Sequence, residues 1–470
     1  MKKPEISRIG FVLGPILFSV IVLTPINGLS FEARIVLGTA FLMGVWWVTE
    51  AIPIYVTALL PLIIFPILHV MELSKVSTFY ADRIIFLLLG GFFLASAIER
   101  TNLHQRFAFN ILKTFGTNPK NIIGAFILVT GSLSAWMSNT ATTLLMLPIA
   151  IAIISSLDIK NKEKFSVCLL LSIAYAASIG GVATLIGTSP NAIFASLSRS
   201  LAGVDVSFAQ WLLVGLPVSA ISLFVLWLYM TNLGMQVNKD PVIGEKTLVM
   251  QKLQELGKIN KDEKIVIAIF VIAIIAWITR GLIWADLFPL VDDSTIALIV
   301  AVSLFLLPSS KNKRLLDWNA AIRIPWGVLF LIGGGLALAG SFTITGVDVW
   351  IADQLSFLQG THYFVIILVL VAVVIFSEYL SNTATAALMI PVAAALAHTL
   401  GINPILLMMP VAIAASYGFI LPSSTPSNAI VLSSGYVSTK MMARIGLPLN
   451  LITVLLVSIL ATLLVPLVWG

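Results

Sequence analysis

The stretch Ser-Asn-Thr-Ala-Thr occurs twice in the chain, at 138–142 and again at 381–385. Two further features recur in the same order around these copies: a glycine run and a Thr/Ser/Pro/Asn segment. The paired features are found at 90–91 and 333–335, and at 187–191 and 424–428. Three matches in one order indicate an internal duplication, so the two Ser-Asn-Thr-Ala-Thr segments mark equivalent points in two halves.

The composition fits a lipid environment. Of 470 residues, 59% are hydrophobic and only 10% are charged, whereas soluble domains carry about 25% charged residues. Cys168 is the only cysteine, which excludes an intrachain disulfide, and the four histidines show no metal-ligand spacing. The net charge of +6 indicates Lys and Arg in cytoplasmic loops and no nucleic-acid partner. No HExxH, GxSxG or paired-carboxylate motif appears, so an enzyme is not expected.

Apolar stretches of the length that crosses a bilayer, about 20 residues, recur along the chain. Nine candidate spans lie at 9–29, 32–50, 53–71, 84–101, 211–233, 264–284, 293–308, 322–345 and 445–468. Two longer stretches, 165–198 and 404–434, are interrupted by Gly or Pro and predict broken spans. Two others, 121–157 and 361–399, are too long for one span and too short for two.

The basic loops decide how these last two stretches run. Lys and Arg cluster at 99–113, 160–164, 239–264, 311–314 and 440–444. With the N-terminus inside, all five loops face the cytoplasm only if 121–157 and 361–399 each enter and leave on the same side. The sequence therefore predicts an all-α polytopic membrane protein with about eleven transmembrane helices, two re-entrant hairpins, a cytoplasmic N-terminus and an external C-terminus.

The duplication is predicted to be inverted. When the broken span 165–198 is counted, the two glycine-rich helices at 84–101 and 322–345 are the fourth and the ninth of the eleven spans. They therefore run in opposite directions, and the hairpins enter from opposite sides. Secondary carriers built in this way bind their substrate at the interface between the repeats.

The hairpin tips and helix breaks carry the predicted chemistry. Irregular backbone at membrane depth is tolerated where it lines a cavity, and Ser, Asn and Thr there offer neutral oxygens. Ser134 and Ser377 each lie four residues before the Ser of a repeated motif, hence on the same helical face. One site for a small hard cation such as Na⁺ is predicted in each half: Ser134, Ser138, Asn139 and Gly187, then Ser377, Ser381, Asn382 and Ser424.

The same residues could also have structural roles. Ser and Thr in membrane helices commonly serve packing or local hydrogen bonds, but duplicated tips paired with duplicated breaks favour binding sites. Glu378 could carry a proton. The first half has Ala135 at the equivalent position, which favours a structural acid bonded to backbone.

These motifs resemble the divalent anion/sodium symporter family, the carriers of dicarboxylates, citrate and sulfate. The matching segments are Trp-Trp-x-x-Glu-Ala-Ile-Pro at 46–53, both Ser-Asn-Thr copies, Gly-Thr-Ser-Pro-Asn at 187–191, and 416–431. The chain departs from the family at 188–190 and 425–427, where relatives often have two consecutive prolines.

The resemblance implies a homodimeric elevator-type transporter in the plasma membrane, with two Na⁺ ions per protomer. Scaffold helices would occupy 1–120 and 265–360, the transport domain 121–234 and 361–470, and a cytoplasmic amphipathic linker 235–264. Carried over to this chain, the substrate contacts are Asn139, Thr140, Thr188, Ser189, Asn382, Thr383, Thr425 and Pro426.

The expected function is Na⁺-coupled symport of a C4-dicarboxylate such as succinate, malate or fumarate. A Na⁺-independent dicarboxylate exchanger and a symporter of sulfate or another divalent anion remain alternatives. A channel is disfavoured, because hairpins that close a site from both sides fit alternating access.

Overall fold

The computed structural model describes residues 3–115, 118–156, 162–235, 245–284, 287–310 and 313–469. Over these residues the chain forms helices and no β-strand, which confirms the predicted all-α fold. Parts of three predicted basic loops, at 160–161, 239–244 and 311–312, lie outside the described residues.

The first seven helices lead from the N-terminus to the first hairpin. They are α1 (Lys3–Leu23), α2 (Phe31–Thr49), α3 (Ile54–Thr57), α4 (Leu60–Ile67), α5 (Leu73–Phe79), α6 (Arg83–Arg100) and α7 (Leu103–Thr114). The predicted span 53–71 is divided between α3 and α4. Pro61 at the start of α4 has no N–H to bond the carbonyl of Thr57, so the helix cannot continue through it.

The core of the first half consists of a hairpin, a broken helix and a long helix. These are α8 (Pro119–Ser134), α9 (Asn139–Ser156), α10 (Lys162–Gly181), α11 (Ser189–Ala202) and α12 (Phe208–Leu228). A tight turn at 135–138 joins α8 to α9, and a loop at 182–188 separates α10 from α11. Both interruptions fall on the segments that the sequence marked.

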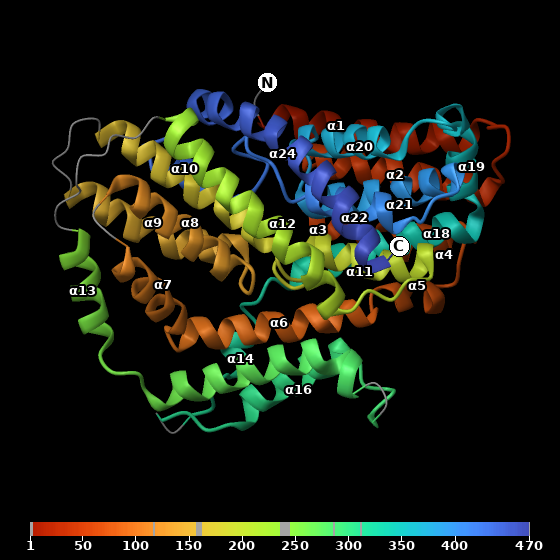
Figure 1. Cartoon of the computed structure of the whole chain (residues 1–470). Coiled ribbons are helices and arrows are strands. Elements are labelled where there is room, and N and C mark those ends of the chain that lie inside the picture. The colour runs from red at the N-terminus through yellow and green to blue at the C-terminus, as the bar shows by residue number, and fades with distance from the viewer. Residues whose placement is uncertain are drawn as a thin grey trace.

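A connecting region follows. It contains η1 (Tyr229–Gly234), α13 (Glu245–Leu256), α14 (Lys261–Thr279), η2 (Arg280–Trp284), α16 (Asp293–Leu306), α17 (Trp318–Ala321), α18 (Trp326–Thr345), α19 (Val347–Gln354) and η3 (Ser356–Leu358). In Figure 1, α14 and α16 lie along α6 at the lower edge of the molecule. Asn260 and Glu263 start α14 with reciprocal side-chain-to-backbone bonds, which satisfy two N–H groups that a helix start leaves free.

The core of the second half repeats the first. It comprises α20 (Tyr363–Phe376), α21 (Asn382–Leu400), α22 (Ile405–Ala414), α23 (Pro426–Ser433) and α24 (Thr439–Trp469). The turn of this hairpin lies at 377–381 and the break in the helix at 415–425.

The packing of the two cores follows the same pattern. In the first half α10 packs against α8, α9 and α12, and in the second half α22 packs against α20, α21 and α24. The halves also exchange partners, because α9 contacts α23 while α21 contacts α11. Helices far apart in the sequence therefore lie side by side, as the different colours of α11 and α21 in Figure 1 show. The duplication read from the sequence is thus also a duplication of contacts.

Seven helices among the described residues are long and apolar enough to cross a membrane, or eight when the bent pair α5 and α6 counts as one span. The pair is bent by 45°. Several shorter apolar helices, including α16, α20 and α22, complete the bundle. The count of eleven spans and the side on which each hairpin enters stay predictions.

Candidate functional site

Four helix N-termini meet where the two halves touch. Ser189, the first residue of α11, lies with its hydroxyl oxygen 2.7 Å from that of Thr383 near the start of α21. Ser427 at the start of α23 donates to the main-chain oxygen of Asn139, the first residue of α9, at 3.3 Å. Since an α-helix carries partial positive charge at its N-terminus, the junction of α9, α11, α21 and α23 favours an anion.

The first hairpin tip presents a group of oxygens to the first helix break. The Ser134 hydroxyl, fully buried, donates to the side-chain oxygen of Asn139 at 2.7 Å and lies 2.7 Å from the Ala177 carbonyl. A Cβ at Gly181 would come within 2.7 Å of that Asn139 oxygen and 3.3 Å of the Gly187 carbonyl oxygen. These oxygens therefore converge on one small space that only glycine leaves open.

The second hairpin tip has an equivalent arrangement. The amide oxygen position of Asn382 lies 3.3 Å from the carbonyl oxygen of Ala415 and 3.1 Å from that of Ser424. Three oxygens facing one another repel unless the amide turns to donate its N–H groups or a cation lies between them. Small hard cations prefer ligands of this kind. The donor set therefore fits Na⁺, and Ala415 joins the residues predicted from sequence.

One asparagine in each half holds its broken helix open. The Asn191 amide donates to the carbonyls of Gly181 at 3.0 Å and Thr184 at 2.7 Å. The Asn428 amide donates to the carbonyls of Gly418 and Leu421, both at 3.0 Å. A shift of 237 residues relates the two sets, since 428 − 191 = 237, 418 − 181 = 237 and 421 − 184 = 237. Both asparagines are fully buried, and they replace bonds that the helix ladder no longer makes.

Glu378 distinguishes the second half from the first. Its carboxylate accepts the backbone N–H groups of Phe419 at 2.9 Å, Ile420 at 2.9 Å and Leu421 at 2.8 Å, and the side-chain amide of Asn450 at 2.5 Å. In the first half, the N–H groups of residues 182 and 183 bond instead to carbonyls three residues earlier. Glu378 thus takes the place of a helical turn, which agrees with the structural role predicted from sequence.

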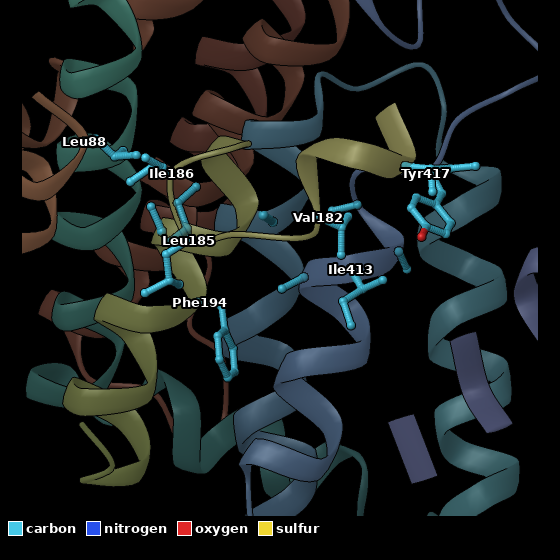
Figure 2. Packing of buried hydrophobic residues seen from close by; sticks show 14 of the residues in the cluster. Leu88, Val182, Leu185, Ile186, Phe194, Ile413 and Tyr417 are labelled. Atoms are coloured by element: carbon cyan, nitrogen blue, oxygen red, sulfur yellow. The ribbon is translucent and has the colours of Figure 1, made fainter. Parts of the chain in front are cut away.

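Apolar side chains surround the polar junction. Figure 2 shows Ile186, in the first break, beside Leu88 of α6, and Val182, directly after α10, near Ile413 of α22. Ile186 lies close against α6 at Gly91, where a Cβ would come within 3.2 Å of its side chain. Residues 182–187 of the first break are all buried, and polar interactions are stronger in such a low-dielectric environment.

The other predicted residues lie at the same junction with different local bonds. Ser138 and Ser381 cap the helices that follow them, accepting the N–H of Ala141 at 3.2 Å and of Ala384 at 3.3 Å. Ser377 directly follows α20 and donates to the carbonyl of Val374 at 2.7 Å. The turns at 135–138 and 377–381 separate Ser134 from Ser138 and Ser377 from Ser381, so the prediction that each pair shares one helical face is wrong. The four remaining substrate positions lie in the first turn or at the N-cap of their helices. They are Thr140 in α9, Thr188 at the start of α11, and Thr425 and Pro426 at the start of α23, where the Thr425 hydroxyl accepts the N–H of Asn428.

Sequence reasoning missed several participants. Thr143 and Ser427 bond across the halves, with their hydroxyl oxygens 3.0 Å apart, and Tyr175 donates to the carbonyl of Phe419 at 2.8 Å. Asn191 and Asn428 were part of the recurring segments but received no role. Their repetition beside Gly and Pro was the signal that could have identified them.

Comparison with known proteins gives a consistent result. The chain matches the family described as sodium:sulfate symporter transmembrane region over residues 8–469. It is 41% identical to the sodium-dependent dicarboxylate transporter SdcS of Staphylococcus saprophyticus, over 98% of this chain and 92% of that protein. It is 40% identical to SdcS of Staphylococcus aureus strain USA300, over 100% of this chain and 94% of that protein.

Among solved structures, the YdaH transporter of Alcanivorax borkumensis superposes with a TM-score of 0.58 at 14% identity, covering 99% of this chain and 98% of that one. At this identity the likeness concerns the fold alone. The family and these relatives are transporters, which confirms that no enzyme is to be expected here. The chain is an integral membrane transporter and belongs to the sodium:sulfate symporter family.

Proposed function

We propose that this protein is a Na⁺-coupled symporter that carries a C4-dicarboxylate such as succinate, malate or fumarate into the cell. The proposal depends on one observation: four helix N-termini meet between two oxygen-lined cups. One cup lies around Asn139 and Gly187, and the other around Asn382 and Ser424. The names of the staphylococcal relatives, sodium-dependent dicarboxylate transporters, support the same substrate and ion.

The charge balance of the junction explains why sodium is needed. The stretches 134–143, 181–192, 377–386 and 414–428 contain no Lys or Arg. A dianion moved out of water must be compensated, because an unpaired buried charge is very costly. Helix N-termini offer about half a positive charge each, but α8, α10, α20 and α22 end at the same turns and breaks, and each C-terminus offers about half a negative charge. The helix ends therefore do not neutralise a dianion, and co-bound cations supply the balance.

We assign one Na⁺ to each cup, two per protomer. The first would be held by Ser134, Ser138, Asn139 and Gly187, and the second by Ser377, Ser381, Asn382 and Ser424. Since Ser138 and Ser381 also cap helices, each uses a remaining lone pair of its hydroxyl oxygen. The substrate would lie between the cups, against Asn139, Thr140, Thr188, Ser189, Asn382, Thr383, Thr425 and Pro426.

The transport domain is proposed to consist of 121–234 and 361–470, moving as an elevator against scaffold segments 1–120 and 265–360 with 235–264 as linker. Side-chain hydrogen bonds between the cores of the two halves, such as Ser189 to Thr383 and Thr143 to Ser427, support the proposal that both cores move together as one rigid body. We further propose a homodimer in the plasma membrane with the N-terminus in the cytoplasm and the C-terminus outside. The mass of the purified protein in detergent tests the dimer.

Uptake of labelled succinate into proteoliposomes, with and without an inward Na⁺ gradient, tests the function. Symport predicts accumulation that depends on the gradient and rises steeply with Na⁺. Equal uptake without Na⁺, together with counterflow, would establish an exchanger instead. Competition that favours sulfate over succinate would reassign the substrate within the same family.

A further inference from the structure

Charged groups of the proposed scaffold meet the proposed transport domain just before α12. Asp205, in the loop that leads into α12, forms an ion pair with Arg83, the first residue of α6. The other terminal nitrogen of Arg83 lies 3.7 Å from Asp292, which caps α16. One scaffold arginine therefore faces two acidic residues, of which one belongs to the scaffold and the other to the transport domain.

A buried carboxylate makes a second contact beside this pair. Asp293, the first residue of α16, accepts the backbone N–H of Phe208, the first residue of α12, at 2.7 Å. Its side chain is only 9% exposed, and Arg280 of the scaffold lies 3.4 Å from the same oxygen. A negative charge is favourable here because a helix carries partial positive charge at its N-terminus. A scaffold carboxylate thus stabilises the start of a transport-domain helix.

Aromatic rings extend this contact to the tip of the first hairpin. Phe208 stacks on Trp277 of α14 with ring centroids 4.7 Å apart, and the Trp277 indole N–H donates to the main-chain oxygen of Asp293 at 3.0 Å. Trp136, in the turn between α8 and α9, packs edge-on against Phe270 of α14 at 4.8 Å. The hairpin tip that carries the first cation cup therefore rests on a scaffold helix.

These contacts hold in one relative position of the two domains. The bond between Phe208 and Asp293 joins a main-chain N–H to a short side chain, so neither group can follow a displacement. A shift of one helical turn, about 5.4 Å, exceeds what a hydrogen bond of about 3 Å tolerates. The ring contacts also need centroids within about 7 Å. An elevator movement of the transport domain therefore breaks the whole group of contacts.

We propose that these residues form a dock that holds the transport domain at one end of its movement, with Asp293 as its positioning residue. The dock consists of Arg83, Asp292 and Asp293 on the scaffold and of Asp205 and Phe208 on the transport domain. Its bonds form in this position and are absent at the other end, so they shift the equilibrium towards the docked position. The inference rests on the proposed elevator movement and names the residues that set its resting position.

Cross-linking across the dock tests whether the contact opens during transport. Arg83→Cys and Asp205→Cys are combined in a Cys168→Ser background and joined by a short bifunctional thiol reagent that a reductant cleaves. Arg100→Cys with Asp317→Cys is the matched control. That ion pair lies within the scaffold and has similar side-chain exposure, 31% and 40% against 29% and 46%.

We expect the dock cross-link to reduce succinate uptake to the level of empty liposomes, and reduction to restore it, while the control cross-link leaves uptake unchanged. Continued uptake by the cross-linked protein would show that the contact persists through the cycle and would overturn the proposal. A dock pair that does not react while the control pair does would overturn it too, since the two sides would then not be neighbours.

A buried thiol measures how strongly the dock holds. Ser294 is 6% exposed and lines one pocket with Leu185 and Val206 of the transport domain. The thiol of Ser294→Cys, again in the Cys168→Ser background, should therefore react with a water-soluble maleimide when the transport domain leaves. The rate of modification then follows the ratio of undocked to docked protein.

Two dock variants should raise this rate. Asp293→Asn keeps an acceptor for Phe208 but loses the charge, so we expect a rise of about fivefold, the difference between a charged and a neutral hydrogen bond. Asp205→Asn removes a partly exposed ion pair and should raise the rate about twofold. Asp317→Asn should leave it unchanged. An unchanged rate in both dock variants would overturn the proposal.

The native Cys168 separates undocking from general loosening. It is fully buried in α10, so with Ser294 intact it should stay unmodified in every variant. A rise in Cys168 modification that matches the rise at Ser294→Cys would overturn the proposal, because both sites would then report local unfolding. If Asp293→Asn fails to assemble, as judged by gel filtration, Asp205→Asn and the cross-link decide.

Failure of the proposed function gives different results. Succinate uptake that is indifferent to Na⁺ refutes symport, and a wild-type protein that accumulates sulfate and no succinate refutes dicarboxylate transport. The cross-link test then uses the anion that is carried. The maleimide test needs no substrate, so it supports or refutes the dock in each case.

Discussion

Replacing Glu378 by Gln should both destabilise the protein and weaken its second cation cup. The carboxylate has two edges: Oε1 accepts from Phe419 and Asn450, and Oε2 accepts from Ile420 and Leu421. An amide keeps one edge as an acceptor and turns the other into a donor. The two hydrogen bonds on the edge that becomes N–H₂ are therefore lost, and the two donors that made them then face another donor. Hydrogen bonds to a charged partner contribute about 1.5–3 kcal/mol each, so the loss is about 3–6 kcal/mol.

The free energy of unfolding is measured by denaturant titration of the purified protein in detergent. Sodium affinity is measured separately, as the Na⁺ concentration that gives half of the maximal thermal stabilisation. That concentration should rise several-fold, because the loop held by Glu378 leads directly to the Ser424 carbonyl. Glu99→Gln, which removes an exposed carboxylate, should cost less than about 0.5 kcal/mol. A cost below about 1 kcal/mol for Glu378→Gln, with sodium dependence unchanged, would refute the reasoning.

Three further predictions concern a buried asparagine, a close contact between two helices and an ion pair. Asn428→Ala removes the amide bonds to the carbonyls of Gly418 and Leu421, which keep only their bonds from Ser424, and should cost about 1–2 kcal/mol in the same titration; a cost near zero would mean that Ser424 is a sufficient donor for both carbonyls. Gly180→Ala places a Cβ 2.3 Å from a main-chain oxygen of α8, so we expect a loss of about 1–3 kcal/mol, and an unchanged yield and stability would contradict this packing. Asp205→Asn breaks an ion pair with Arg83 whose side chains are 46% and 29% exposed, so the cost should stay below about 1 kcal/mol.

The pH dependence of that ion pair has a definite sign. Burial raises the pKa of Asp205, but the hydrogen bond and charge of Arg83 outweigh it and hold this pKa below its usual value. A lowered pKa stabilises the folded state above the unfolded value, about 3.9, and the stabilisation is lost as the pH falls through the folded value. The difference in unfolding free energy between wild type and Asp205→Asn should therefore stay constant from pH 5 to 8. A change within that window would contradict the assignment.

The architecture was predictable from sequence because it depends on local properties. Apolar length placed most spans, and Gly and Pro placed both helix breaks. The turns at 135–138 and 377–381 fall at or directly before the repeated motifs. The division of 53–71 into α3 and α4 was missed, although Pro61 lies in its middle. The apolar stretch is continuous there, and hydropathy by itself does not register a missing N–H.

The site was only partly predictable. The sequence by itself determined a membrane-embedded helical duplication, with polar motifs at its hairpin tips and helix breaks, because composition, periodicity and repetition are properties of the chain read in order. Tertiary structure alone decided that Ser427 reaches Asn139 across 288 residues and that Glu378 holds the loop at 419–421. Such bonds depend on which helices pack together, and that choice is made by the buried surface of the whole bundle.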